Sequence, residues 1–261
     1  LIETNNSVNA SVALSPTSRI DTTYFKNEVI SLSPGQIAQI LATQSTFIPI
    51  IIMMLIIFSG QMIISSMALE KENKTLETLL TLPVKRVSIV AGKIISSAII
   101  GLMLAVIYMI GFSYYMSSLE VSGSINLAQL GLALDPTDLL LLGLSVFATL
   151  IAALSLCMLL GTMAKNYKSA QTLTFPVTLF ALIPMFMTMF KDFDTLPLAL
   201  KAVLFGIPFS HPMMAPRSLL FGDYLMVFAG IIYVSIFAII MIIIVVWVFK
   251  TDKIVTGTAN F

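Results

Sequence analysis

Five long apolar runs constrain the fold of this chain more than any other feature of its sequence. They lie at about residues 46–68, 94–116, 139–163, 171–190 and 224–249. As helices rising about 1.5 Å per residue, runs of this length cross roughly 30 Å of hydrocarbon. Hydrophobic residues make up 58% of the chain and charged residues only 10%, against roughly 25% charged residues in soluble domains. The sequence therefore predicts an all-α membrane protein, a polytopic bundle of transmembrane helices occupying residues 46–261.

Several of these runs carry end signals. The third opens with Asp135, Pro136 and Asp138, a pattern typical of a capped helix start. Trp247, near the end of the fifth, is predicted at the membrane interface. The lone Cys157 lies within the third run and is predicted to be a small buried core residue.

Two other segments are not spans by composition. Residues 1–45 are polar, with a strand expected at 22–30 and a short helix at 35–43, and they are interpreted as an external segment that ends a larger domain. Residues 191–223 are mostly apolar but are interrupted by four prolines and two glycines. Apolar stretches of about ten residues broken in this way predict re-entrant helices rather than spans.

The densest patch of charge lies at residues 69–93, between the first two runs. Its first part, 69–81, has no glycine or proline and favours a helix, with Glu70 four residues before Lys74 as in a helical ion pair. Leucines at i, i+3 and i+4 give this helix one narrow apolar face, and Pro83 is expected to end it. The pattern fits either a helix lying on the headgroups or a docking helix for a soluble partner.

The residues of this patch resemble the coupling segment of permease subunits in type-2 ATP-binding-cassette transporters. The resemblance covers an acidic start, a Thr-Leu-Glu core at 75–77, a Pro-Val exit followed by two basic residues at 83–86, and Gly92-Lys93 opening the next span. One departure is Asn73-Lys74, where a glycine commonly precedes the threonine in that family.

The resemblance implies an ATP-driven permease, an exporter, that works with cytoplasmic ATPase subunits and with a second permease copy or homologue. ATP and magnesium are expected on the ATPase subunits. The residues implied at the ATPase interface are Glu70, Glu72, Thr75, Leu76, Glu77, Leu79, Leu80, Pro83, Lys85 and Arg86.

Lysine and arginine counts predict the orientation. Nine of the 14 lie in segment 69–93, in segment 164–170 and in the C-terminal tail. The positive-inside rule places these segments in the cytoplasm and residues 1–45 outside the cell membrane. An external start predicts one more span upstream, six in all.

The chemistry of an enzyme is not apparent in the sequence. His211 is the only histidine and is expected in an external loop, there is no His/Cys cluster for a metal, and the phosphate-loop pattern is missing around Gly92-Lys93. A net charge of +1 argues against a nucleic-acid partner. We therefore expect no catalytic, cofactor-binding or metal-binding residues in this chain.

Polar side chains within the apolar runs are few. The runs contain no Asp, Glu, Lys, Arg or His, whereas ion-coupled carriers use such residues at membrane depth. Gln61, Ser65, Thr174 and Thr178 are candidates to line a pathway, and hydrogen bonding between helices accounts for them equally well. Small residues at 97, 101 and 105, and at 148 and 152, predict helix contacts, more readily within one subunit than across a dimer.

Three other functions stay open from the residues alone. A secondary carrier or channel would work without an ATPase. A membrane scaffold or assembly factor would use the charged segment to recruit a different partner. A membrane enzyme ranks last, because the apolar runs offer no acid, base or metal ligand.

Overall fold

The structure, a computed structural model, describes residues 23–25, 28–30, 34–75, 83–120, 134–191 and 193–250. The chain divides into two compact units, residues 1–43 and 44–261, and the division falls inside one long helix. The first unit contains an antiparallel pair of short strands, β1 (Thr23–Phe25) and β2 (Glu28–Ile30), in which Thr23 pairs with Ile30. The single strand predicted at 22–30 is wrong: the structure has two short strands there, paired with each other.

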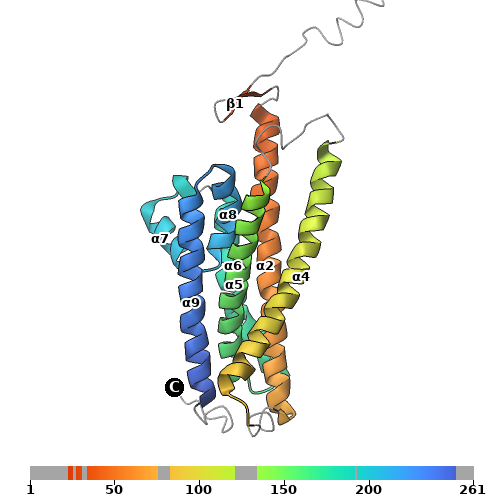
Figure 1. The fold of residues 1–261 in the computed structure, drawn as a ribbon, viewed down its shortest axis with the longest axis vertical. Coiled ribbons are helices and arrows are strands. Elements are labelled where there is room, and N and C mark those ends of the chain that lie inside the picture. The colour runs from red at the N-terminus through yellow and green to blue at the C-terminus, as the bar shows by residue number, and fades with distance from the viewer. Residues whose placement is uncertain are drawn as a thin grey trace, which may run out of the picture. The chain divides into compact units, whose positions relative to one another are not determined.

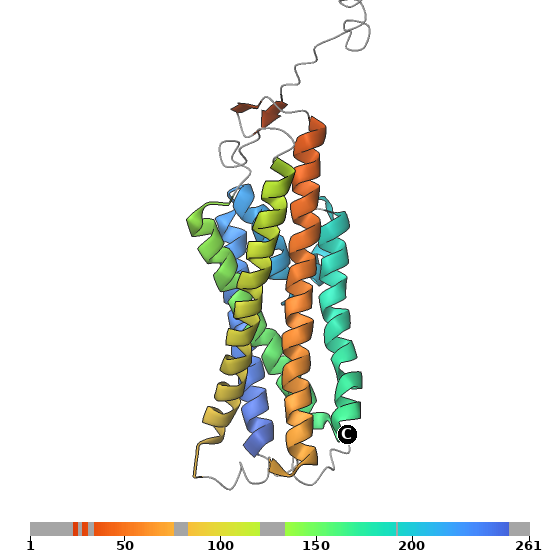
Figure 2. The ribbon, with the colours of Figure 1, turned by 90° about the vertical axis from the view of Figure 1, so that its right-hand side faces the viewer.

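Within the described residues, five helices are long and apolar enough to cross a membrane, which confirms the predicted number (Figures 1 and 2). They are α2 (Pro34–Glu72), α4 (Arg86–Glu120), α5 (Pro136–Met163), α6 (Tyr167–Phe190) and α9 (Tyr224–Lys250). Of these, α5 packs against α4, α6 and α9, and fifteen of its residues are buried. The apolar core of the second unit is therefore built around α5.

Most helices extend beyond the predicted runs into polar sequence. α2 includes the short helix expected at 35–43, α4 begins at Arg86, and α6 begins at Tyr167. The prediction of spans without charged residues is consequently wrong at the helix ends, where Lys93 lies inside α4 and Asp138 is buried in α5. Residues at the ends of apolar runs continue a helix where no glycine or proline stops it and where neighbouring helices provide polar partners.

The start of α5 follows its sequence signal. Asp135 is the N-cap, Pro136 occupies the first turn, and the backbone N–H of Asp135 donates to Oδ2 of Asp138 over 3.3 Å. This confirms the predicted capped start.

The segment before the last span folds as two short helices, α7 (Leu198–Gly206) and α8 (Ser210–Leu220), bent by 114° at the break between them. This matches the interrupted pair expected from the prolines and glycines. The sequence predicts His211 in a loop, and this is wrong. His211 lies in the first turn of α8 and is 4% exposed. The expectation failed because Pro212 lies in the first turn of the helix, where no backbone donor is needed, so this proline does not stop the helix.

Close contacts join α2 to α5 and α4 to α2. A Cβ at Gly60 would lie 2.6 Å from Sγ of Cys157, and one at Gly101 would lie 2.7 Å from Oγ of Ser59. Ala148 and Ala152 form a buried cluster with α9. The small residues therefore serve helix packing within one subunit, and Cys157 is buried as predicted.

Candidate functional site

The candidate site lies where α2 ends and the coupling segment, defined here as residues 73–85, begins. Asn73 N–H donates to the carbonyl of Leu69 over 2.9 Å, and Lys74 N–H donates to that of Lys71 over 3.1 Å. The hydroxyl of Thr75 donates to the carbonyl of Glu70 over 3.1 Å. These bonds satisfy carbonyls that have no partner further along the helix, so they form a C-terminal cap on α2.

Lys74 leaves the helix in the left-handed region, with φ of 58°. The predicted continuous helix over 69–81 is therefore wrong: residues 69–72 complete α2, and the chain turns at Asn73–Lys74. Position 74 is the one where the coupling segments that this chain resembles commonly carry glycine, the residue that adopts this conformation at least cost.

Three consecutive charged residues occupy the last turn of α2. Successive side chains on a helix point about 100° apart, so three in a row reach three different neighbours. Glu70 pairs with Lys93 of α4, and its other oxygen accepts from Ser66 over 3.1 Å. The predicted ion pair of Glu70 with Lys74 is replaced by this contact, because Lys74 is outside the helical register.

Lys71 reaches the end of α5. Its ammonium group donates to the carbonyl of Thr162 and, over 3.3 Å, to that of Ala164. A helix C-terminus carries a partial negative charge, and a cation placed there stabilises it by roughly 0.3–1 kcal/mol. Lys71 therefore caps α5 from a different helix.

Glu72 reaches the start of α6, where its Oε2 accepts from the backbone N–H of Tyr167 over 3.2 Å. A carboxylate suits a helix N-terminus for the same electrostatic reason. The N-cap of α6 is Asn166, whose Oδ1 accepts from Ser169 N–H over 2.8 Å. Only residues 164–166 separate α5 from α6.

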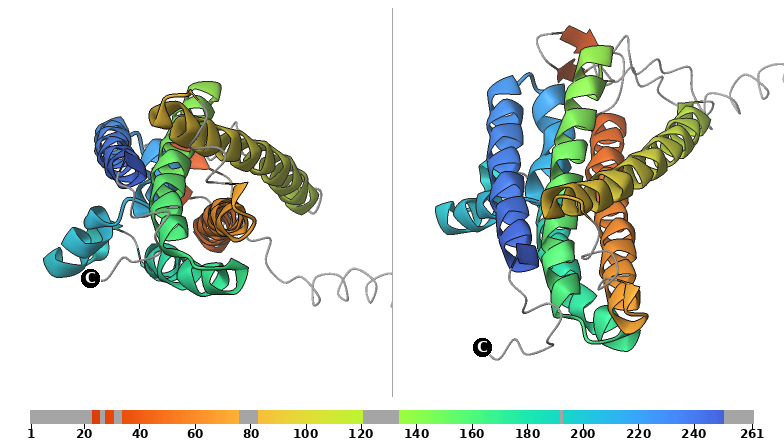
Figure 3. Two further views of the ribbon diagram at one scale, coloured as in Figure 1. Left: turned by 90° about the horizontal axis from the view of Figure 1, so that it is seen from below. Right: turned by 60° about the horizontal axis from the view of Figure 1, so that its bottom comes forward.

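We call this arrangement the clasp: Lys71 on the carbonyls of Thr162 and Ala164, and Glu72 on the N–H of Tyr167. Figure 3, in the view from below, shows the end of α2 with α4, α5 and α6 around it. Sequence reasoning missed Lys71 and Lys93 as site residues, although their position at the end of an apolar run is a signal for them.

The structure places only part of the predicted ATPase interface. Leu76, Glu77, Leu79 and Leu80 lie outside the described residues, and α4 begins at Arg86. Pro83 and Lys85 are exposed, as is Val84, a large apolar residue at 50% exposure. Thr75 is exposed as well, whereas Glu70 and Glu72 already have partners in this chain. A role of these residues in holding an ATPase stays a prediction.

The four candidates for a pathway lining form a connected set between α2 and α6. Gln61 donates to Ser65 over 3.0 Å and accepts from the hydroxyl of Thr174, while Thr178 donates to the carbonyl of Thr174 over 3.1 Å. The contact between Gln61 and Thr174 is a hydrogen bond between helices, the alternative left open by the sequence. Whether these residues also line a pathway stays a prediction.

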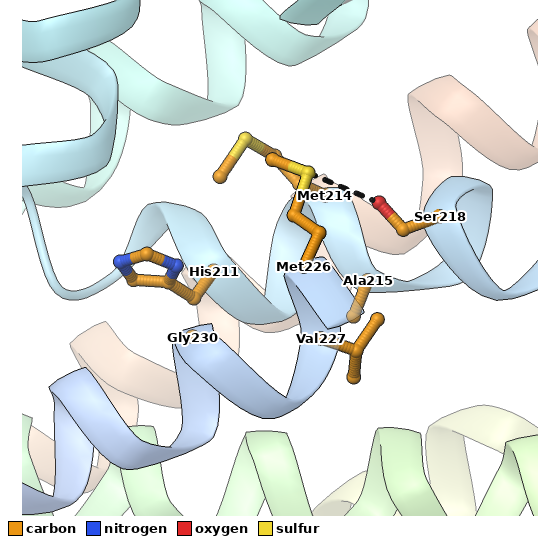
Figure 4. Close-up of a pocket in the computed structure, with 7 residues that line it drawn as sticks. All are labelled: His211, Met214, Ala215, Ser218, Met226, Val227 and Gly230. Carbon is orange, nitrogen blue, oxygen red and sulfur yellow. Dashed lines mark hydrogen bonds between the residues drawn. The ribbon is translucent and has the colours of Figure 1, made fainter. Parts of the chain in front are cut away.

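A small cavity of about 10 Å³ lies between α8 and α9 (Figure 4). Figure 4 shows the His211 ring beside Gly230, with the sulfur of Met226 facing the hydroxyl of Ser218. The volume holds about one water molecule, so it is no substrate site. His211 packs edge-on against Phe205 and lies within hydrogen-bonding distance, 3.1 Å, of that residue's carbonyl. Its surroundings are those of a packing residue.

Elements of a metal site are likewise lacking: within the described part of the chain, no three His, Cys, Asp or Glu residues are grouped to bind an ion. In the described part of the chain, five membrane-length helices, a bent pair before the last of them and a charged segment after the first define a polytopic membrane protein.

A family model described as ABC-2 family transporter protein matches residues 2–247. The chain therefore belongs to this family and is a multi-pass membrane permease of the ATP-binding-cassette transporters. No curated protein matches the chain.

Proposed function

We propose that this permease is the membrane subunit of an ATP-driven exporter, and that its coupling segment docks onto a separate ATPase subunit on the cytoplasmic side. The observation that carries the proposal is the exposure of the segment at one end of the helices: Lys74, Thr75, Pro83, Val84 and Lys85 are all exposed. In the sequence, the same segment also contains Leu76, Leu79 and Leu80, and a narrow apolar face within a charged segment suits a protein partner.

In the proposed mechanism, closure of two ATPase subunits around ATP and magnesium pushes on the coupling segment. In the sequence, Leu76, Leu79 and Leu80 have the i, i+3, i+4 spacing of one helical face, and in the proposal this face contacts the ATPase, with Glu77, Lys85 and Arg86 at its rim. Pro83 makes a stiff corner before α4. Two permease copies, or two related chains, would enclose the pathway. The export direction rests on the likeness of this segment to type-2 permeases.

The proposed orientation rests on charge. Residues 69–93, residues 164–170 and the end of α9 with the tail after it hold nine of the 14 lysines and arginines, which favours the cytoplasmic side for all three. Residues 1–43 would then be external.

The test is a co-purification of the permease with its ATPase from the native membrane. Leu79→Asp places a charge in the centre of the predicted apolar face, and a buried unpaired charge is costly. We expect this variant to lose the ATPase while remaining in the membrane at the wild-type level.

Thr78→Asp is the matched control, because helical spacing places position 78 on the opposite side of the same segment. It should keep the ATPase. Equal recovery of the ATPase with both variants would contradict the proposed docking face. Transport that continues without ATP and stops when an ion gradient is removed would favour a secondary carrier.

A further inference from the structure

The two helices that flank the coupling segment, α2 and α4, are joined to each other by an ion pair close to the segment. Glu70 lies one turn before the cap at Thr75, and Lys93 lies in the second turn of α4, after the segment has ended. The ion pair between Glu70 and Lys93 therefore closes the segment into a loop with a fixed base. A force on the segment acts on α2 and α4 together.

The clasp links the same base to two further helices, α5 and α6. Lys71 and Glu72 hold the two sides of the turn between α5 and α6, which is only three residues long. Both contacts are made by side chains in the last turn of α2, next to its C-terminal cap.

We infer that Lys71 and Glu72 are positioning residues that pass movement of the coupling segment from α2 into α5 and α6. This inference rests on the proposed function, since the movement starts at the ATPase. α2 and α6 also carry the hydrogen bond between Gln61 and Thr174, so a displaced α6 start changes the polar contact between these two helices.

Three features of the clasp favour transmission over simple fixation. The contacts go to backbone groups, whose positions follow the helices themselves. Lys71 lies at the negative C-terminal end of α5 and Glu72 at the positive N-terminal end of α6, so each charge is favoured at its own helix end. Glu72 and Tyr167 are exposed, so their contact can be made and broken in water at little cost.

The experiment measures deuterium uptake at backbone amides of residues 161–170 in the complete complex with its co-purified ATPase. Uptake is compared between the nucleotide-free complex and the complex trapped with ATP, magnesium and vanadate. We expect trapping to change uptake at these residues in the wild type. Glu72 also belongs to the predicted ATPase interface, so recovery of the ATPase is measured first. In complexes of the double variant Lys71→Met/Glu72→Gln that retain the ATPase, this change should fall within replicate error.

Two further variants separate transmission from a structural role. Lys71→Arg keeps a cationic donor and should restore the nucleotide-dependent change when Glu72 is retained. Lys168→Met makes the same substitution as Lys71→Met at an exposed residue of the first turn of α6 and should respond as the wild type does. If the clasp were only structural, the double variant would alter uptake in both states and keep the difference between them.

Each outcome decides something. An unchanged nucleotide-dependent difference in the double variant, or no difference at residues 161–170 in the wild-type complex, overturns the inference and leaves the proposed function standing. A wild-type permease that recovers no ATPase refutes the proposed function, and the inference with it. If the double variant does not assemble, the comparison is made with Lys71→Met alone, which leaves the predicted ATPase interface unchanged, and a fully retained difference overturns the role of Lys71.

Discussion

At the scale of single residues, Lys74 is the position where sequence and conformation disagree most. Its φ of 58° is adopted at little cost by glycine and, less readily, by asparagine. A lysine here is accepted because the cap bonds of residues 73–75 fix the turn. The left-handed conformation at this residue sets the direction in which the coupling segment leaves α2.

Lys74→Gly should therefore stabilise the permease by about 1 kcal/mol, because it removes the steric penalty of a side chain at positive φ. Lys74→Val should destabilise it by a similar or larger amount, since a β-branched side chain fits this conformation worst. Thermal unfolding of the detergent-purified permease measures both. An unfolding midpoint that is lower for the glycine variant than for the valine variant would contradict the assigned turn.

At the scale of elements, the contact between α2 and α5 fixes how near the coupling segment lies to the turn between α5 and α6. A Cβ at Gly161 would lie 2.9 Å from Cβ of Met67 and 3.3 Å from the backbone Cα of Ile64. Backbone atoms cannot move aside as a flexible side chain can, so any side chain at position 161 forces the helices apart.

Gly161→Ala should destabilise the permease by about 1–3 kcal/mol through overpacking. Gly143 is the matched control: it lies in the same helix, and a Cβ there meets nothing within 4 Å. Gly143→Ala should be neutral or stabilising by up to about 1 kcal/mol, the helix-propensity difference between the two residues. Thermal unfolding of the two variants side by side measures the effect, and equal midpoints would contradict the close approach of α2 and α5.

The apolar runs were sufficient to predict the five helices, because length and the absence of charge are local properties of the sequence. The helix ends were not predictable, since they depend on partners far along the chain: Glu72 meets Tyr167, 95 positions away, and Lys71 meets Thr162, 91 positions away. The burial of His211 was not predictable for the same reason, since its side chain packs against Phe205 of α7 and Gly230 of α9.

The candidate site was predicted in part. Its place in the chain and its acidic start follow from the sequence. The turn at Lys74 does not follow from the sequence, because lysine has no preference for the left-handed region. The partner of Glu70 does not follow from the sequence either. The sequence predicts a local helical ion pair with Lys74, whereas the structure pairs Glu70 with Lys93, 23 positions away.

At the scale of the whole molecule, charge is concentrated where helices end and the apolar surface is left to the membrane. Large apolar side chains are exposed along the outer faces of α4, α6 and α9, as expected for helices in contact with lipid. At one end, the last turn of α2 joins α4, α5 and α6 through charged side chains. A docked ATPase would act on this end.

The central claim is that an ATPase holds the coupling segment from the cytoplasmic side, and Val84 is the residue best placed to test it. It is exposed and lies between the predicted docking helix and α4. A photo-reactive amino acid at position 84, activated in intact cells, should form its main adduct with an ATP-binding-cassette ATPase. Adducts with lipid alone, or labelling of a cysteine at position 84 by a membrane-impermeant reagent added outside the cell, would contradict the claim.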